Sequence, residues 1–324
     1  MPRFVRQQVI EHEIGPTGRF VLRVTTPDVD LRATDGPIAT VRVEFELRAD
    51  NDAHADQLLE RVRFEVQERA GALEVTEQRH GAGGVGSIAR LLGMGSGRFD
   101  SKVVAEVPAG AEVTFDGVSS DLDSFGFNGR QEYRMVSGDM TLRDLGGDLR
   151  VRGVSSDISL RAEAPIRLQL NTVSGDVSAV APRYDALHIV TVSGDVEIEG
   201  ELSRAEESRI ETVSGDVQLS IHGGTTLEVR ALSSDVSVSL PHRAEGSRDR
   251  RRFVIGDGAA RVVFSSMSGD LIAGSPRRSV PMPPTPPTAP VPPTAPGDEL
   301  AILRALERGD ITVDEAAARL ARRS

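Results

Sequence analysis

The sequence contains no cysteine and no tryptophan, and aromatic residues make up only 4% of its 324 residues. Without cysteine, a disulfide framework, a cysteine-ligated zinc site and a cysteine nucleophile are excluded. No apolar run approaches the roughly 20 residues of a membrane-spanning helix. The N-terminal segment has no apolar stretch of signal-peptide length and carries acidic side chains early. These absences predict a cytoplasmic protein without an integral membrane span, and they leave surface exposure open.

Basic side chains are in the minority. The chain has 38 Lys and Arg against 49 Asp and Glu, a formal net charge of −11. A protein that binds nucleic acid independently of sequence needs a basic face. The acidic balance therefore argues against nucleic acid as a partner, and the length predicts one to three domains.

What the sequence does have is a five-residue motif that recurs eight times. Each copy holds Ser-Gly-Asp or Ser-Ser-Asp between two apolar residues, and the copies start at Val118, Val136, Val154, Val173, Val192, Val213, Leu232 and Met267. Neighbouring copies start 18 to 21 residues apart, except for a last step of 35 residues, in which residues 255–259 (IGDGA) are a candidate degenerate copy. A constant period near 19 residues is typical of an array of one structural unit.

The segments between the motifs alternate apolar and polar residues, as Val196 and Ile198 do around Glu197. This period of two predicts strands, and Ser-Gly-Asp predicts tight turns between them. About 19 residues cannot enclose a core alone, whereas stacked coils share one, and a propeller blade needs about 40 residues. The predicted fold class is therefore all-β, a single-stranded β-solenoid (β-helix) with Val, Leu and Ile in interior ladders.

Stacking would place the motif aspartates in one column, about 4.8 Å apart. They are Asp121, Asp139, Asp157, Asp176, Asp195, Asp216, Asp235 and Asp270. Like charges at ~4 Å repel by about 1 kcal/mol in water, so something must offset the repulsion. The favoured interpretation is hydrogen bonding of each carboxylate within its turn. The alternative is a Ca²⁺ site along Asp139, Asp157, Asp176, Asp195 and Asp216, although the known Ca²⁺-binding nonapeptide repeat has a shorter period and more glycine.

Residues 1–117 lack the motif but keep strand patterns at residues 20–24, 41–47, 73–76 and 103–107, with one helix expected at 53–61. We interpret them as irregular opening coils that cap a solenoid spanning residues 1–274, whose regular part is 118–274. Gly81, Gly83 and Gly86 formally match G-x-G-x-x-G. Because the chain after them is all strand, a surface loop is predicted instead of a nucleotide site.

The C-terminal part has a different composition. Residues 275–297 hold ten of the 18 prolines, which predicts a polyproline II linker; docking of its PxxP strings on an aromatic groove is the alternative. Residues 298–324 show the pattern of a helical hairpin, with Gly309 ending the first helix and a capping box of Thr312 and Glu315 starting the second.

Such a hairpin is too small to be stable alone. Its apolar face is therefore expected to bind another copy, another protein or the solenoid. The predicted partner-binding residues are Leu300, Leu303, Leu306, Ile311 and Leu320. A DNA-reading helix-turn-helix is disfavoured by the acidic residues of this segment.

The repeated VSGDV motif resembles a bacterial family of candidate adhesins, domains of unknown function that are expected to form β-solenoids. The resemblance covers about residues 20–274. The pattern L-x-x-L-E-x-G-x-I-T-x-x-E-A at residues 303–316 is similar to SHOCT-like short helical domains. The resemblance implies oligomer or partner contacts through the hairpin, and it implies neither catalytic residues nor a cofactor.

Together these features predict a non-enzymatic structural and interaction protein: a solenoid scaffold tethered to a helical oligomerisation or partner-binding module. A surface adhesin or ligand-binding module is the alternative. A polysaccharide-active enzyme is less favoured, because glycoside cleavage needs two carboxylates in unlike environments and the repeat makes the aspartates equivalent. The histidines fall at unrelated positions of the repeat: His12, His54, His80, His188, His222 and His242.

Overall fold

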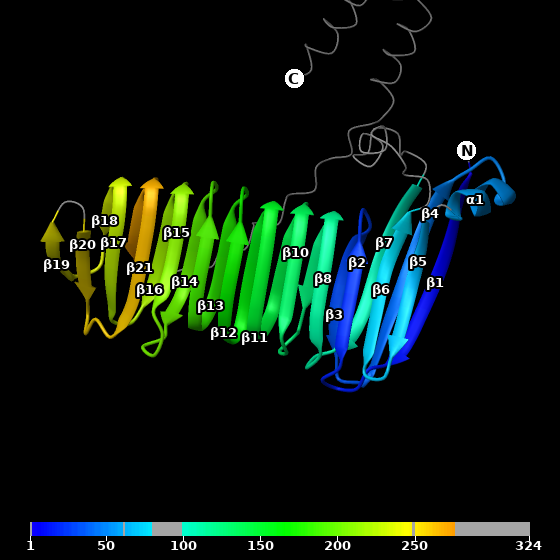
Figure 1. Ribbon diagram of the computed structural model, residues 1–324, viewed down its shortest axis with the longest axis horizontal. Coiled ribbons are helices and arrows are strands. Elements are labelled where there is room, and N and C mark those ends of the chain that lie inside the picture. The colour runs from blue at the N-terminus through cyan, green and yellow to red at the C-terminus, as the bar shows by residue number, and fades with distance from the viewer. Residues whose placement is uncertain (1, 61, 80–98, 248–249, 276–324) are drawn as a thin grey trace, which may run out of the picture. The chain divides into compact units, whose positions relative to one another are not determined.

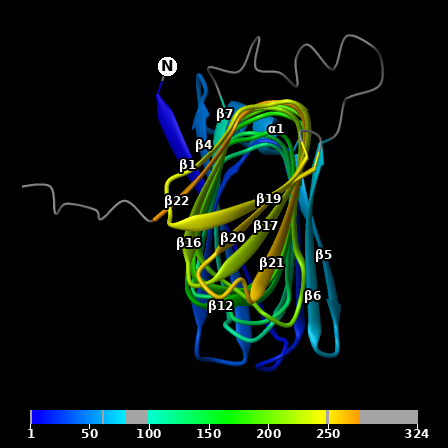
Figure 2. The same ribbon diagram turned by 90° about the vertical axis from the view of Figure 1, so that its left-hand side faces the viewer.

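The computed structural model describes residues 2–60, 62–79, 99–247 and 250–275, which lie within one unit, Met1–Arg277. The chain winds into flattened coils that stack along one axis (Figures 1 and 2). The predicted all-β class and solenoid-like stacking are confirmed. The glycine-rich segment 81–97, the linker after Ser275 and the hairpin at 298–324 lie outside the described residues.

Each coil has two long sides, and neighbouring coils hydrogen-bond through these sides into two walls. Side by side, the first wall contains β1 (Arg3–Glu13), β4 (Ile38–Arg48), β7 (Phe99–Pro108), β3 (Asp28–Thr34), β9 (Leu122–Phe125), the first parts of β11 (Met140–Ser155), β12 (Ile158–Thr172) and β13 (Val177–Thr191), β14 (Val196–Leu202), β16 (Val217–His222), β22 (Leu271–Gly274) and β18 (Val236–Val238).

The second wall contains β5 (Val62–Arg69), β6 (Ala72–Arg79), β2 (Arg19–Val24), β8 (Glu112–Ser119), β10 (Gln131–Ser137), the second parts of β11, β12 and β13, β15 (Ser208–Ser214), β21 (Ala260–Ser268), β17 (Thr225–Ser233), β20 (Arg250–Ile255) and β19 (His242–Ser247). Pairing is parallel in the middle of the stack and antiparallel at its ends, in β1–β4–β7, β5–β6 and β17–β20–β19.

The two walls meet at two edges. At one edge the long strands β11, β12 and β13 bend through register shifts, for example between Arg143 and Gly147. At the other edge the chain turns through the five-residue motif, so we call it the motif edge. Apolar side chains of both walls fill the space between them, and residues such as Ile189, Ile198 and Ile210 are completely buried.

The N-terminal residues form the coils at one end of the stack, and a helix, α1 (Asp52–Leu59), lies where residues 53–61 predicted one. It begins there because the Asn51 side chain accepts a hydrogen bond from the His54 backbone N–H at 2.9 Å. Each of the four predicted N-terminal strands corresponds to an observed one, β2, β4, β6 and β7. No helix in the described part of the chain has the length and apolar composition needed to cross a membrane.

The order of coils along the stack differs from their order in the sequence. The coil of β21 and β22 lies between that of β15 and β16 and that of β17 and β18. The interpretation of residues 255–259 as a degenerate motif copy is therefore wrong. Gly256 and Asp257 form the turn between β20 and β21, and the extra residues of the 35-residue step build the β19–β20 hairpin.

A partly buried carboxylate links the inserted coil to its neighbours. Glu228 on β17 accepts hydrogen bonds from Arg252 of β20 at 2.7 Å and from Arg261 of β21 at 3.0 Å, and its side chain is only 14% exposed. These guanidinium groups, Arg252 first, lower the pKa of Glu228 below its ordinary value. The three strands at this end of the stack are thus joined by charge as well as by their backbones.

Candidate functional site

The motif edge places the two apolar residues of each motif on opposite sides of the wall. In the copy Val192–Val196, Val192 is 44% exposed, whereas Val196 is 2% exposed. Side chains alternate along the chain at a strand. Thr191 faces the core, so Val192 after it faces solvent. The next strand begins with Val196, which faces the core again. Of the two apolar residues in each motif, only the one that follows the aspartate therefore belongs to the expected interior ladders of Val, Leu and Ile.

Five copies of the motif have glycine at the third position, and the geometry explains why. Gly138, Gly175, Gly194, Gly215 and Gly269 have φ between 110° and 137°. A Cβ on any of these glycines would lie 2.1 to 2.3 Å from a carbonyl oxygen of the neighbouring coil. Glycine is therefore required both by its backbone conformation and by the close approach of two coils.

The other three copies have serine at this position. Ser120, Ser156 and Ser234 adopt negative φ, and each has a buried hydroxyl oxygen without a hydrogen-bond partner among the residues that the structure describes. The serine copies thus follow a different backbone path from the glycine copies.

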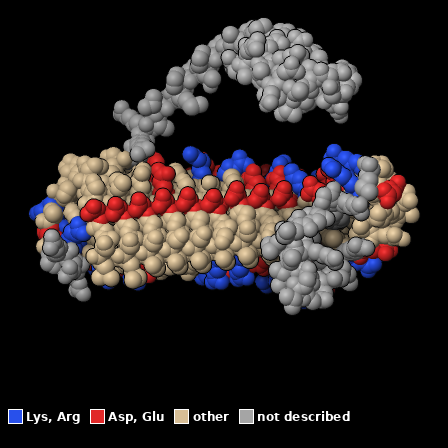
Figure 3. Space-filling model, turned by 90° about the horizontal axis from the view of Figure 1, so that it is seen from above, with Lys and Arg blue, Asp and Glu red and all other residues tan. Residues whose placement is uncertain are grey.

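The motif aspartates lie in one row, which we call the aspartate row. The predicted in-register column is confirmed, and Figure 3 shows it as a red line along the edge. The Asp195 carboxylate accepts a hydrogen bond from the Asp216 backbone N–H at 3.0 Å, and the Asp216 carboxylate accepts one from Asp270 at 2.8 Å. Four further aspartates repeat the contact at 2.9 Å: Asp121, Asp157, Asp176 and Asp270.

These hydrogen bonds support the favoured explanation for a line of like charges, with one modification. Each bond joins neighbouring coils instead of closing a turn within one coil. Hydrogen bonds to an ionised carboxylate are stronger than neutral ones. The row therefore gains a stacking contact that offsets part of the repulsion between its carboxylates.

A calcium site along this row finds no support in the geometry. Within the described residues, no group of three or more His, Asp or Glu side chains is arranged to hold a metal ion. Asp139, Asp157, Asp176, Asp195 and Asp216 belong to successive coils, the last four joined by one hydrogen bond from coil to coil, instead of converging on one point.

Asp28 is a member of the row that the sequence pattern missed. The Asp121 backbone N–H donates to its carboxylate at 3.4 Å, and Val29 pairs with Leu122 in register. The signal was present in the sequence, because Pro27-Asp28-Val29 follows Val24 as a longer version of the motif.

The first residues of the motifs form a second row beside the aspartates, which we call the valine row. Its members are exposed by 39% to 84%: Val118, Val136, Val154, Val173, Val192, Val213, Met267 and Leu232. Figure 3 shows uncharged surface next to the aspartate row. Patches of contiguous exposed apolar surface on soluble proteins commonly mark interaction sites. The motif edge is therefore the candidate functional site.

Two grooves follow this edge. One, of about 500 Å³, is lined by Val118, Val136 and Val154 together with arginines of the second wall. The other, of about 450 Å³, lies on the far side of the aspartate row and has a mixed lining that includes Ser178, Gln218 and Ile272. The aspartate row thus lies between two grooves.

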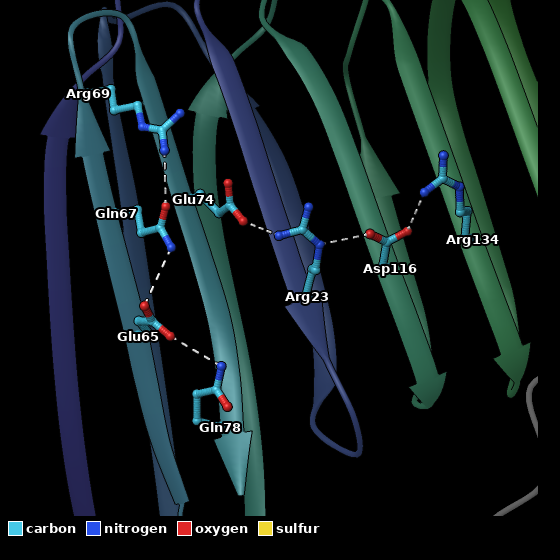
Figure 4. Close-up of polar contacts among 8 residues, drawn as sticks. All are labelled: Arg23, Glu65, Gln67, Arg69, Glu74, Gln78, Asp116 and Arg134. Carbon is cyan, nitrogen blue, oxygen red and sulfur yellow. Dashed lines mark hydrogen bonds and ion pairs between the residues drawn. The ribbon is translucent and has the colours of Figure 1, made fainter.

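Charged side chains link the strands beside the first groove (Figure 4). Arg23 of β2 contacts Glu74 of β6 and donates from Nε to Asp116 of β8 at 3.2 Å, and Arg134 of β10 donates to the same carboxylate at 3.3 Å. The carboxylates of Glu132 and Asp116 raise the pKa of Arg134 above its ordinary value. This chain of ion pairs fixes the outer surface of four neighbouring strands. Farther along the wall, Glu65 similarly accepts hydrogen bonds from Gln67 and Gln78.

The buried Tyr133 takes part in a network of hydrogen bonds inside the core. The Tyr133 hydroxyl donates to Gln131 at 3.0 Å and contacts the Ser124 hydroxyl at 2.9 Å. Burial raises the pKa of Tyr133 far above its ordinary value, so the hydroxyl stays protonated. Gln131 in turn donates to the Gly146 carbonyl at 2.8 Å, which satisfies a buried backbone group.

The other residues singled out from the sequence are scattered or outside the described part. His12 and His54 lie on β1 and α1, and His188, His222 and His242 lie on three separate strands, so the structure does not bring the five together. His80 and the hairpin residues Leu300, Leu303, Leu306, Ile311 and Leu320 lie outside the described residues.

The chain was compared with known families, curated proteins and solved structures. The family described as Toastrack DUF4097 matches residues 19–272. None of the curated proteins matches the chain. Among solved structures, a candidate lipid-binding protein from Parabacteroides distasonis ATCC 8503 is 12% identical, with a TM-score of 0.43, and the match covers 82% of this chain and 96% of that one.

Two further structures are similar over comparable lengths. A candidate adhesin from Bacteroides fragilis NCTC 9343 is 13% identical, with a TM-score of 0.37, and covers 83% of this chain and 97% of its own. A candidate cell adhesion protein from Clostridium sporogenes ATCC 15579 is 8% identical, with a TM-score of 0.27, and covers 85% and 100%. Because the family match spans most of the solenoid, the chain belongs to the Toastrack DUF4097 family.

Proposed function

We propose that this protein is a non-enzymatic interaction scaffold whose solenoid presents the motif edge to protein partners. The observation that carries the proposal is the valine row, eight apolar side chains held in line and exposed by 39% to 84%. A strand edge that served only the fold would have no need of an apolar residue at every outward first position, since polar side chains fit there equally well.

The two rows define the chemistry of the partner. Burial of the valine row favours a partner with apolar side chains along an extended surface. A carboxylate has about four acceptor positions, so an aspartate that accepts one backbone N–H can accept further hydrogen bonds. A partner that carries Lys or Arg beside its apolar side chains therefore matches the edge in charge.

The equivalence of the aspartates also supports a role without catalysis. Six of them accept the same hydrogen bond from the next coil, at 2.8 to 3.0 Å. Acid–base catalysis by two carboxylates needs environments that move their pKa values apart. A row of like environments suits repeated binding contacts better than chemistry.

The proposal includes the C-terminal segment as a second module. The linker at 275–297 and the helical pattern at 298–324 are suited to tether the solenoid to another copy or to another protein through Leu300, Leu303, Leu306, Ile311 and Leu320. An adhesin that binds a surface ligand through the same edge is the second candidate, since a repeated exposed edge offers many equivalent contacts.

Site-specific photocrosslinking in the native cells tests which surface meets a partner. A photoreactive phenylalanine analogue is placed at Val154 or Val173 of the valine row and, as matched controls, at Glu163 or Ala164 on the opposite edge of the same coils. All four positions are exposed.

We expect discrete crosslinked products from the valine-row positions and none from the controls, because only the valine row is covered by the partner. Mass spectrometry of the products then identifies the partner. Crosslinking of equal yield from both edges, or from the control edge alone, would contradict the proposal.

A further inference from the structure

The first wall ends in a long strand with an unpaired edge. β1 pairs with β4 along its whole length of 11 residues, and no other described strand pairs with it. It is the end strand of the stack in Figure 1. The N–H and C=O groups of alternate β1 residues therefore point away from the protein, a template for a further strand.

The outward side chains of β1 include two apolar ones. Val5 is 59% exposed and Val9 is 50% exposed, and the exposed Gln7 lies between them. Natural proteins usually protect a long edge strand with charged side chains, proline, a bulge or a covering element. β1 has neither proline nor a bulge, and its ladder to β4 is regular. Its charged side chains are of both signs, which permits pairing with a second strand of matching charge.

The charges of β1 are arranged with opposite signs at its two ends. Arg3 and Arg6 lie in the first half and Glu11 and Glu13 in the second. Two antiparallel copies centred on Gln7 would place Arg3 opposite Glu11 twice and Val5 opposite Val9 twice. Cross-strand pairs of these kinds stabilise a sheet, whereas like charges directly opposite each other destabilise it.

We propose that two copies of this chain pair β1 with β1 in this antiparallel register, so that the first walls of two solenoids continue into each other across a two-fold axis at Gln7. This interface goes beyond the proposed function, since it uses neither the motif edge nor the C-terminal segment. A two-fold contact of one surface with itself closes after two copies.

On the inward side of β1, the same register places Phe4 opposite Ile10 of the second copy, a partly buried ring beside a buried aliphatic side chain. Arg6, which donates to Asp52 and Asp56 of its own chain, would lie opposite Gln8. A cavity of about 500 Å³ also lies at this end, lined by β1, α1 and β5 residues that include Gln8, Leu59 and Phe64. A second solenoid placed end to end would cover it.

The opposite end of the stack is a poorer match for β1. The end strand of the first wall there, β18, spans only Val236–Val238. The second wall ends in β19, a strand of six residues. Neither offers the length of β1, so self-pairing of β1 buries more of the edge than head-to-tail stacking.

Light scattering coupled to size-exclusion chromatography of the full-length chain tests the interface. The double variant V5K/V9K places lysine opposite lysine, and F125K/I272K is the control, with two exposed apolar residues on β9 and β22 that belong neither to β1 nor to the valine row. We expect V5K/V9K to halve the molar mass of the wild type and the control to leave it unchanged. A wild-type mass unaffected by V5K/V9K, or halved equally by the control, would overturn the proposal.

A charge swap shows whether a failure comes from the register or from misfolding. R3E alone and E11R alone place like charges opposite each other twice and should weaken the dimer by about tenfold. The double variant R3E/E11R restores both pairs and should restore the dimer. If the double variant is as weak as the single ones, this register is wrong.

The absence of native cysteine allows a direct check of the two-fold centre. In the proposed register Q7C faces its own copy, so mild oxidation should give a disulfide-linked dimer, whereas Q7C in the V5K/V9K background should not. If the wild type forms species larger than a dimer and oxidised Q7C gives no disulfide-linked dimer, the solenoids stack head to tail and the proposal is overturned.

Discussion

Replacing Val196 by asparagine is expected to destabilise the solenoid by about 3–5 kcal/mol, whereas the same change at Val192 should cost less than about 1 kcal/mol. The two valines are four residues apart in one motif and face opposite sides of the wall. Val196 is 2% exposed and Val192 is 44% exposed. V196N removes buried apolar surface and buries an amide among aliphatic side chains.

Urea unfolding followed by circular dichroism measures this difference. Val196 begins β14, whereas Val192 lies in the turn after β13. Strand propensity spans only about 1 kcal/mol, so a larger gap between the two midpoints reports the difference in burial. Equal losses of stability for V192N and V196N would mean that the motif valines are not divided between the core and the surface.

The second large effect is expected at the third position of the motif. Gly194 has a φ of +115°, and a Cβ there would lie 2.2 Å from the Gly175 carbonyl oxygen. Gly194→Ala must therefore push two coils apart or change the turn, and we expect a loss of about 3 kcal/mol or more.

Gly223→Ala is the matched control for this prediction. Gly223 also has a positive φ, +100°, but a Cβ on this residue would meet nothing within 4 Å. The Gly223→Ala variant should lose only about 1–2 kcal/mol of stability, because alanine adopts a positive φ unfavourably. The difference between the two variants in thermal or urea unfolding isolates the contact between coils. If both lose the same amount, the close approach of Gly194 to its neighbour is not a constraint on the fold.

Much of the architecture follows from local patterns in the sequence. The period of about 19 residues predicts stacked coils, and alternation within them predicts the strands. The aspartate row then follows from geometry alone, because equivalent positions of stacked coils must lie in line. These predictions succeed since each depends on residues within one repeat and on its nearest neighbours.

The exposed valine row does not follow from residue type, because type alone assigns every apolar residue to the core. Alternation does not continue through a turn, so the residue before Ser-Gly-Asp has to be judged from the strand that precedes it. Val213 lies two residues after Glu211, and Val154 lies two residues after Arg152. Residues two apart on a strand face the same side, so each valine faces outward with its charged neighbour. The sequence therefore did contain the signal for the exposed valine row.

The exchanged order of the last two coils has no local signal beyond the 35-residue step. Which rung a strand occupies depends on competition between long-range pairings with similar motifs. β21 fits next to β15 because both offer the same inward pattern, for example Ile210 beside Phe264. Because the motif copies are alike, the sequence pattern does not determine which copy pairs with which.

The central claim is that the motif corners form one line, in the order Asp216, Asp270, Asp235. Pairs of introduced cysteines test it directly in a chain without native cysteine. Ser268 pairs in register with both Ser214 and Ser233. Ser214 and Ser233 are then two coils, about 9–10 Å, apart, beyond the ~7 Å between Cα atoms that a disulfide can bridge. The account predicts rapid disulfide formation in S214C/S268C and S233C/S268C and none in S214C/S233C. Efficient bridging in S214C/S233C, with free thiols in S214C/S268C, would contradict it.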